Sequence, residues 1–313
     1  MTDDDHKQLK PRADNLPAAL QRSKQLLALN AGIRARTQAL ATADDGWFER
    51  LCAWADEFDI SEAALPRDKA QLLALQELNL SCKELGKLPA EIGKLGNLQT
   101  LWLSDNQLTT LPAAIGQLGN LQGLDLSYNQ LTALPDAIGQ LGNLQELNLW
   151  NNQLAALPAA IGQLGNLQTL DLSCNQLTAL PDEIWQLGNL QTLDLSCNQL
   201  TALPAAIGQL GNLQTLDLSC NQLTALPDEI WQLGNLQTLH LSCNQLTTLP
   251  TAIGQLESLQ ELDLRSNPLT ALPTSLKRLY CERNGALEIK LDNYLLLEYD
   301  DEAFSSFDDD TPF

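Results

Sequence analysis

Histidine and basic residues are scarce in this sequence, and their scarcity excludes several functions. Only His6 and His240 occur, so a catalytic site that depends on histidine has almost nothing to draw on. The 18 lysines and arginines face 39 acidic residues, which gives a formal net charge of −21. Nucleic acids and anionic membranes bind through Lys and Arg, so we expect neither as a partner. A basic protein is the partner that this charge favours.

Long apolar runs are also missing. The polar residues 1–10 contain no apolar stretch of the kind that a secretory signal needs. No segment approaches the ~18 apolar residues of a membrane-spanning helix. The seven cysteines are an odd number, and most of them fall at one position of a repeat, which favours reduced thiols over a disulfide framework. We therefore expect a cytoplasmic protein, with export that needs no cleaved signal as the alternative.

Motifs of the common enzyme classes are absent too. The sequence has no glycine-rich phosphate loop, no Gly-x-Ser-x-Gly motif and no zinc-protease helix. We expect no enzymatic activity, no cofactor and no bound metal.

What the sequence has in abundance is one phrase that returns every 23 residues. It reads Leu-x-x-Leu-x-Leu-Ser-x-Asn-Gln-Leu-Thr-x-Leu-Pro-x-x-Ile-Gly-x-Leu-Gly-Asn. Its first asparagine recurs at Asn106, Asn129, Asn152, Asn175, Asn198, Asn221, Asn244 and Asn267. A fixed period of this length predicts a stack of similar units. The function must then lie in the positions that vary, because stacking uses the constant ones.

Each unit combines a short strand with a short helical arc. Leu101 and Leu103 alternate with period two, which points both to one face of a strand and leaves Thr100 and Trp102 on the other. Pro112 opens a short helical or 3₁₀ segment, and glycines turn the chain back. Stacking predicts an α/β solenoid with a parallel β-sheet on one side. The bulkier helical arcs should curve it so that the sheet is concave.

The repeat also sets the expected domain organisation. It divides the chain into a flexible N-terminus (1–14), a helical N-terminal cap (15–74), a solenoid of nine full repeats and one short repeat (75–284), and a C-terminal cap with an acidic tail (285–313).

Both ends of the solenoid need a cover. In the N-terminal cap, aromatic residues from Trp47 to Phe58 follow helical spacing and should bury the first repeat. At the other end, Leu276 and Leu279 are expected to frame the short repeat, which has lost part of its linking arc. Residues 287–297 are expected to form a last strand or helix over that end.

This pattern resembles the leucine-rich repeat family over about residues 75–284. The Leu-Pro-x-x-Ile-Gly-x-Leu arc is most similar to intracellular repeats of the Ras-suppressor or Ras-binding type and to similar arrays in bacteria. The resemblance implies a horseshoe that binds other proteins through its concave sheet. It implies no reaction, because members without an attached domain are generally not enzymes.

Three aromatic residues on successive units are the first candidate binding residues. Trp102, Tyr128 and Trp150 are expected at outward positions of the sheet, and exposed aromatics concentrate binding energy. The alternative is that they stack on one another and on the cap.

A row of acidic residues is the second candidate. Asp125, Asp171, Asp194 and Asp217 share the central outward position of their strands. Neighbouring strands lie ~5 Å apart, so these like charges disfavour one another and a basic ligand would relieve the repulsion. The alternative is a solvated polar face that keeps the protein soluble. His240 and Asp263 continue the same row. The nearby Arg265 is the last candidate binding residue.

A row of cysteines suggests a metal or redox site, but its geometry argues against both. Its members are Cys174, Cys197, Cys220 and Cys243. A straight ladder of thiols does not converge on a tetrahedral metal, and parallel side chains fit disulfide geometry poorly. Residues 158–203 and 204–249 differ at only two positions, Asp194 against His240 and Ala202 against Thr248. Such a duplication makes the aligned cysteines and aspartates copies rather than independent choices.

The sequence therefore predicts a non-enzymatic interaction module or scaffold, monomeric, that binds a protein partner on its concave sheet. One alternative is a bacterial effector that acts on host signalling. Another is a regulatory subunit of a phosphatase or of a small GTPase. A self-associating structural protein is a third.

Overall fold

The computed structural model describes residues 46–283 and 286–292. The chain forms two compact units, Met1–Asp59 and Ile60–Phe313. The predicted flexible N-terminus, most of the predicted cap and the acidic tail lie outside the described residues.

In the first unit, helix α2 (Trp47–Glu57) occupies the segment whose aromatic spacing predicted a helix. Its buried face contains Trp47, Leu51 and Trp54. The Trp54 ring packs 5.7 Å from that of Phe58, measured between centroids. That this helix covers the first repeat stays a prediction.

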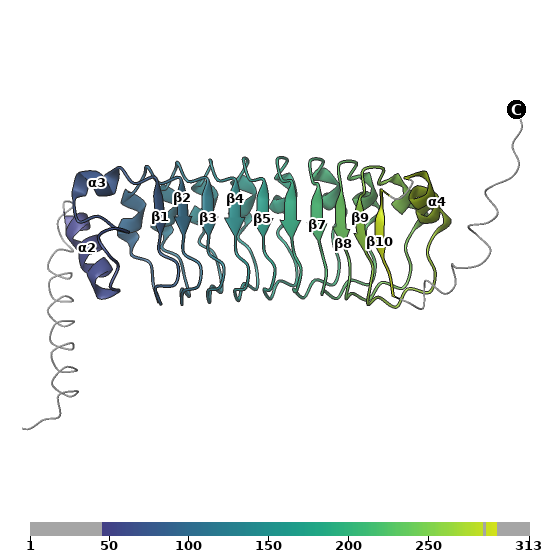
Figure 1. The fold of residues 1–313 in the computed structure, drawn as a ribbon, viewed down its shortest axis with the longest axis horizontal. Coiled ribbons are helices and arrows are strands. Elements are labelled where there is room, and N and C mark those ends of the chain that lie inside the picture. The colour runs from purple at the N-terminus through teal and green to yellow at the C-terminus, as the bar shows by residue number, and fades with distance from the viewer. Residues whose placement is uncertain (1–45, 284–285, 293–313) are drawn as a thin grey trace, which may run out of the picture. The chain divides into compact units, whose positions relative to one another are not determined.

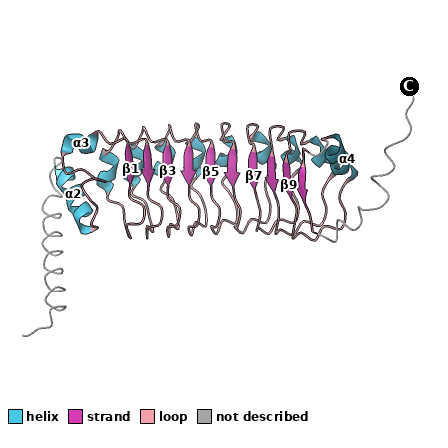
Figure 2. Cartoon of the chain, in the orientation of Figure 1, coloured by secondary structure: helices cyan, strands magenta, loops and turns pink. Residues whose placement is uncertain are grey.

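The second unit begins with helix α3 (Lys69–Leu73), whose N-cap Asp68 accepts a hydrogen bond from the Gln71 N–H. Short parallel strands then follow in chain order and form one open, uncurled sheet (Figures 1 and 2). They are β1 (Glu77–Asn79), β2 (Thr100–Trp102), β3 (Gly123–Asp125), β4 (Glu146–Asn148), β5 (Thr169–Asp171), β6 (Thr192–Asp194), β7 (Thr215–Asp217), β8 (Thr238–His240), β9 (Glu261–Asp263) and β10 (Glu288–Lys290). The predicted repeat solenoid is confirmed.

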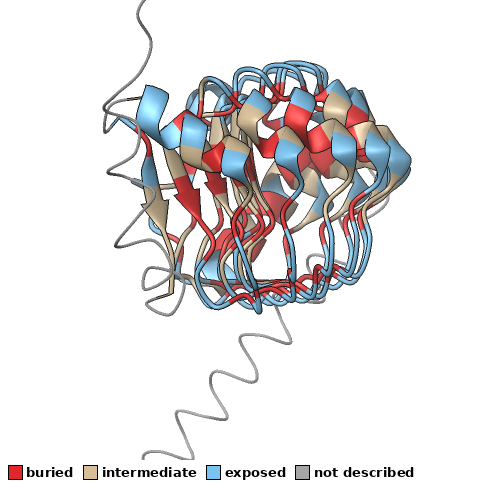
Figure 3. Cartoon of the chain, turned by 90° about the vertical axis from the view of Figure 1, so that its right-hand side faces the viewer, coloured by how far each residue is buried: buried red, intermediate tan, exposed pale blue. Residues whose placement is uncertain are grey.

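A 3₁₀ helix links each strand to the next as far as β9. These arcs are η3 (Ala90–Lys94), η4 (Ala113–Gln117), η5 (Asp136–Gln140), η6 (Ala159–Gln163), η7 (Asp182–Gln186), η8 (Ala205–Gln209), η9 (Asp228–Gln232) and η10 (Thr251–Gln255). The core lies between sheet and arcs, where residues such as Leu101, Leu103 and Ile115 are fully buried (Figure 3). The alternation therefore turns the leucines of each strand into the core and leaves the residues between them on the opposite face of the sheet.

The repeated asparagine ties each unit to the one before it. Asn106 donates from Nδ2 to the Leu80 and Leu103 carbonyls, and its Oδ1 accepts from the Leu85 N–H, at 2.9 Å each. Equivalent bonds recur up to Asn267. This buried amide is fully bonded, as such a group must be.

Glycine sets the spacing of most arcs. A Cβ atom at Gly116 would lie 2.5 Å from the carbonyl oxygen of Ala137 in the next arc. Trp185 and Trp231 hold the equivalent position in η7 and η9, where they are almost fully buried and the following arc packs less closely. Their burial shows that these two tryptophans pack among the arcs and do not face a partner.

The last unit corrects the sequence analysis. Leu276 and Leu279 do not frame a short strand: they are the buried residues of helix α4 (Thr274–Glu282). Strand β10 follows, and its Glu288 pairs with Glu261, 27 residues earlier, whereas other strand partners lie 23 apart. The unit is thus longer than the others, not shorter. In most of the other units the arc ends with Ile-Gly-x-Leu-Gly-Asn, and its glycines break the helical turn. The segment after Pro273 lacks this sequence, so it forms an α-helix instead of a short 3₁₀ helix.

Candidate functional site

The candidate site is the solvent-facing side of the sheet, which we call the sheet face. The register of the parallel strands aligns their third residues in one row across the sheet. From β1 to β10 the row reads Asn79, Trp102, Asp125, Asn148, Asp171, Asp194, Asp217, His240, Asp263 and Lys290. The predicted acidic row is therefore a set of true neighbours from β5 to β7.

Two of the three predicted aromatic residues meet on this face. The rings of Tyr128 and Trp150 lie 4.5 Å apart between centroids at an interplanar angle of 62°. Tyr128 is 43% exposed and Trp150 36% exposed. Trp102 is half-buried in the central row, and within the described residues no ring contact joins it to either. The structure thus brings together a pair and not a trio.

Tyr128 also holds an unusual backbone conformation. Its φ is 51°, in the left-handed region that bulky residues rarely adopt. Asp105 and Asn151 occupy the same position in the adjacent units, and such short polar residues tolerate this conformation better. The turn itself imposes this conformation, because the equivalent residue of each unit from Cys82 to Ser266 has a φ between 51° and 58°. Tyr128 is thus a bulky residue at a position where the backbone favours small or polar ones.

The aspartates of the row have a structural task. Each accepts a hydrogen bond from the backbone N–H two residues later, as Asp171 does from Ser173 at 2.9 Å and Asp194 from Ser196 at 2.8 Å. Asn148 makes the same bond to the Trp150 N–H at 3.0 Å. The bend at the end of the strand therefore needs a side-chain oxygen and not a negative charge, so the charge of these aspartates exceeds the structural requirement.

Negative charge accumulates in the middle of the row. Burial raises the pKa of Asp194, and the charges of Asp217 and Asp171 raise it further, while the hydrogen bonds from Ser196 lower it. The net shift is upward, so the ionised carboxylate is disfavoured here. A cation placed over this part of the sheet face would relieve the repulsion.

His240 ends the acidic row by bridging two strands. Its Nδ1 lies 3.1 Å from Asp217 Oδ2 and its Nε2 lies 3.1 Å from Glu261 Oε1. Burial alone would lower the pKa of His240, but the hydrogen bonds with Asp217 and Glu261 outweigh it and raise that pKa. Both ring nitrogens can donate only in the imidazolium form, so the geometry favours a protonated ring.

Ion pairs follow on β9 and β10. Arg265 binds Asp263 with two hydrogen bonds, at 2.9 Å from Nε and 2.5 Å from Nη2. Burial raises the pKa of Asp263, but the bonds from Arg265 lower it overall. Lys290 Nζ lies 2.5 Å from Glu261 Oε1. His240, Asp263 and Arg265 are thus engaged in ion pairs within the sheet. Asp217, the last aspartate of the acidic row, is engaged through His240.

Sequence reasoning missed Glu261 and Lys290. Glu261 carries no distinguishing signal in the sequence, because Glu77 and Glu146 occupy the same strand position. Lys290 was missed because β10 departs from the 23-residue period, although the alternation Leu287-Glu-Ile-Lys290 was the available signal.

The cysteine row lies beside the strands, in the same left-handed position as Tyr128. Burial and the neighbouring thiols of Cys174 and Cys220 raise the pKa of Cys197 to about 12. A thiol with such a pKa is neutral at pH 7 and a poor nucleophile. Among the described residues, no group of three His, Cys, Asp or Glu side chains is placed to hold a metal ion.

None of the described helices is both long enough and apolar enough to cross a membrane.

Family models identify the repeats. A model described as leucine-rich repeat region matches residues 61–155 and 184–281, and a second, described as leucine rich repeat, matches residues 142–200. Comparison with curated proteins gives no match.

Solved structures give similar results. A leucine-rich repeat protein of Leptospira interrogans is 35% identical, over 75% of this chain and 82% of that one, with a TM-score of 0.38. The ectodomain of the Arabidopsis thaliana receptor kinase GASSHO1/SCHENGEN3, in complex with CASPARIAN STRIP INTEGRITY FACTOR 2, is 34% identical over 66% of this chain, with a TM-score of 0.50. The functional domain of InlJ from Listeria monocytogenes, which includes a cysteine ladder, is 25% identical over 71% of this chain, with a TM-score of 0.53. The chain covers only 28% of the plant ectodomain and 54% of the InlJ domain.

Proposed function

Because this chain belongs to the leucine-rich repeat family, whose repeats are typically interaction modules, we propose that it is a non-enzymatic scaffold that binds a basic protein on its sheet face. The observation that carries the proposal is the Tyr128–Trp150 pair. Both rings are exposed and in mutual contact, and Tyr128 places a large aromatic side chain at a left-handed turn position where the other units carry cysteine or a short polar residue. These two residues are the proposed anchors, with Trp102 beside them on β2.

The acidic row supplies the second half of the mechanism. Asp171, Asp194 and Asp217 on adjacent strands attract a basic segment and speed its encounter. The strands hold these side chains in fixed register, so binding orders few new groups and loses little entropy. Asp125, next to Trp102 across β2 and β3, connects the anchors to the row.

A solved neighbour supports this use of the fold. The plant receptor ectodomain was solved in complex with another factor, CASPARIAN STRIP INTEGRITY FACTOR 2. That comparison supports protein recognition in general and carries no information about the partner of this chain.

The test is an affinity capture from native lysate with the wild-type protein and the double variant Tyr128→Ala/Trp150→Ala. We expect wild type to retain a basic protein that the variant loses at least tenfold, because aromatic anchors dominate such interfaces. Tyr280→Ala removes an exposed aromatic ring from α4 and serves as the matched control. Equal capture by wild type and double variant, with unchanged circular dichroism, would overturn the proposed anchors.

A further inference from the structure

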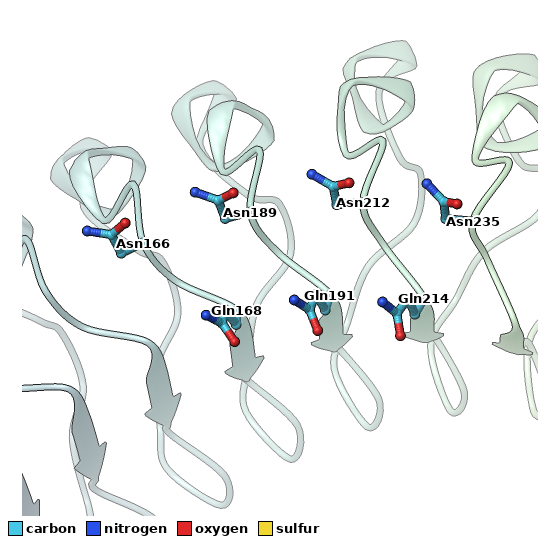
Figure 4. Close-up of a pocket in the computed structure, with 7 residues that line it drawn as sticks. All are labelled: Asn166, Gln168, Asn189, Gln191, Asn212, Gln214 and Asn235. Carbon is cyan, nitrogen blue, oxygen red and sulfur yellow. The ribbon is translucent and has the colours of Figure 1, made fainter.

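A hollow that is separate from the acidic row lies along the amino ends of strands β5 to β8. Its volume is about 500 Å³, and amide side chains line it (Figure 4). One row consists of Asn166, Asn189, Asn212 and Asn235. The other consists of Gln168, Gln191 and Gln214, each directly before its strand. We call this hollow the amide groove.

The asparagine row is partly used for stacking. Asn189 Nδ2 donates to the Gly165 carbonyl of the preceding unit at 2.7 Å, and Asn212 to that of Gly188 at 2.6 Å. These bonds fix the side chains in place. Their Oδ1 atoms accept no hydrogen bond from the described residues, so each amide keeps a free acceptor.

The glutamine row is not used at all. Gln168, Gln191 and Gln214 are exposed, and among the described residues none of their side chains makes a hydrogen bond. Only their backbone groups serve the sheet: the Gln191 N–H donates to the Gln168 carbonyl, and the Gln191 carbonyl accepts from the Gln214 and Thr215 N–H groups. Each side chain therefore offers two donor hydrogens and one acceptor oxygen at every strand.

The lining selects a neutral ligand. No charged and no apolar side chain lines the groove, so neither ion pairing nor apolar burial can hold a molecule there. The groove lies in a chain with a net charge of −21, which repels acidic molecules. A ligand must instead offer many neutral hydrogen-bonding groups.

The spacing of the amide side chains limits the class of ligand that fits the groove. The amides repeat with the strands, about every 4.8 Å. An extended peptide presents groups on one side only every second residue, about every 6.6 Å. Its groups therefore no longer match the amides after one strand. In an extended β-1,4-linked glycan, each sugar ring advances about one strand spacing. Successive rings are turned over, but polar substituents lie on both edges of each ring, so every ring can offer hydrogen-bonding groups to the same row of amides. We propose that the amide groove binds a neutral, extended β-1,4-linked glycan, about one sugar per repeat.

The test is isothermal titration of the full chain with cellohexaose and chitohexaose. Maltohexaose serves as a glycan of the same length whose chain coils. We expect at least one extended hexaose to bind and maltohexaose not to bind. Because the contacts are neutral, the affinity should be the same in 50 mM and 500 mM NaCl, in line with charge screening.

Matched variants locate the site. Gln191→Ala/Gln214→Ala removes two amides of the groove and should weaken binding at least about tenfold, since each lost hydrogen bond is a several-fold effect. Gln199→Ala/Gln222→Ala removes two exposed glutamines of the same units outside the groove and should leave the affinity unchanged. No binding of either extended glycan, equal binding of maltohexaose, or equal loss in both double variants would overturn the proposal.

Discussion

At the scale of single residues, the hydrogen bond that closes the bend after each strand can be accepted by either aspartate or asparagine, which differ in charge. Asp194 and Asn148 both accept the N–H two residues later, at 2.8 and 3.0 Å. An Asp→Asn change in the acidic row therefore removes charge and keeps the bend. This separation lets charge and structure be tested apart.

Replacing Asp194 by Asn should stabilise the protein at neutral pH. The folded-state pKa of Asp194 is raised, chiefly by burial, so the ionised form opposes folding. This penalty is absent below the unfolded pKa and is complete once the pH has passed the raised folded pKa. We expect a gain of about 0.5 kcal/mol in the free energy of unfolding at pH 7 and none at pH 3, measured by urea titration. A gain of the same size at both pH values would contradict the charge argument.

His240 should contribute stability only while it is protonated. Its folded pKa is raised by Asp217 and Glu261 against the opposing effect of burial, with Asp263 and Lys290 as the other charges around it. A raised pKa in a base gives stability that is full below the unfolded pKa and is lost as the pH rises through the folded one. His240→Asn should therefore cost about 0.5 to 1 kcal/mol at pH 5.5 and almost nothing at pH 9. The measurement is urea titration of wild type and variant at pH 5.5 and pH 9. The same difference in the free energy of unfolding at both pH values would contradict the bridge.

At the scale of elements, the residue at the glycine position of each arc decides how closely the next arc can lie. Gly116 allows a close approach to Ala137, whereas Trp185 fills the space and the next arc packs less closely. The looser packing after η7 and η9 thus follows from the volume of their tryptophan side chains.

A methyl group at Gly116 should be costly because it meets backbone. Gly116→Ala should lower the free energy of unfolding by about 1 to 3 kcal/mol through the forced shift of η5. Gly119→Ala is the matched control, since no atom lies within 4 Å of its added Cβ, and should change stability by less than about 1 kcal/mol. Equal effects of the two substitutions in urea titration would show that arc spacing does not depend on Gly116.

Elements that follow the period could be predicted from the sequence, and those that break it could not. The alternation of Leu101 and Leu103 placed strand β2 correctly, because every unit repeats the same packing. Helix α4 was missed because Leu276 and Leu279 fit two frames, and only the absence of the glycine stop distinguishes them. Within the site, the row from Asp171 to Asp217 followed from the register. The contacts of His240 did not, because they depend on side-chain directions across strands 21 and 23 residues apart.

At the scale of the whole molecule, the repeat unit offers two surfaces with different chemistry. The sheet face is aromatic near β3 and β4 and acidic from β5 to β7, and it carries ion pairs at β9 and β10. The amide groove is neutral. Salt should distinguish them, because screening weakens a basic partner on the sheet face and leaves a neutral glycan unaffected.

The most direct test of the central claim compares two triple variants that remove the same charge from different faces. Asp171→Asn/Asp194→Asn/Asp217→Asn acts on the sheet face and keeps each bend, and Asp136→Asn/Asp182→Asn/Asp228→Asn acts on exposed positions of the arcs. The measurement is the association rate of the captured partner with each variant at low salt. We predict at least a tenfold decrease for the sheet-face variant alone, because steering depends on local charge. An equal decrease in both variants, or none in either, would contradict recognition by the sheet face.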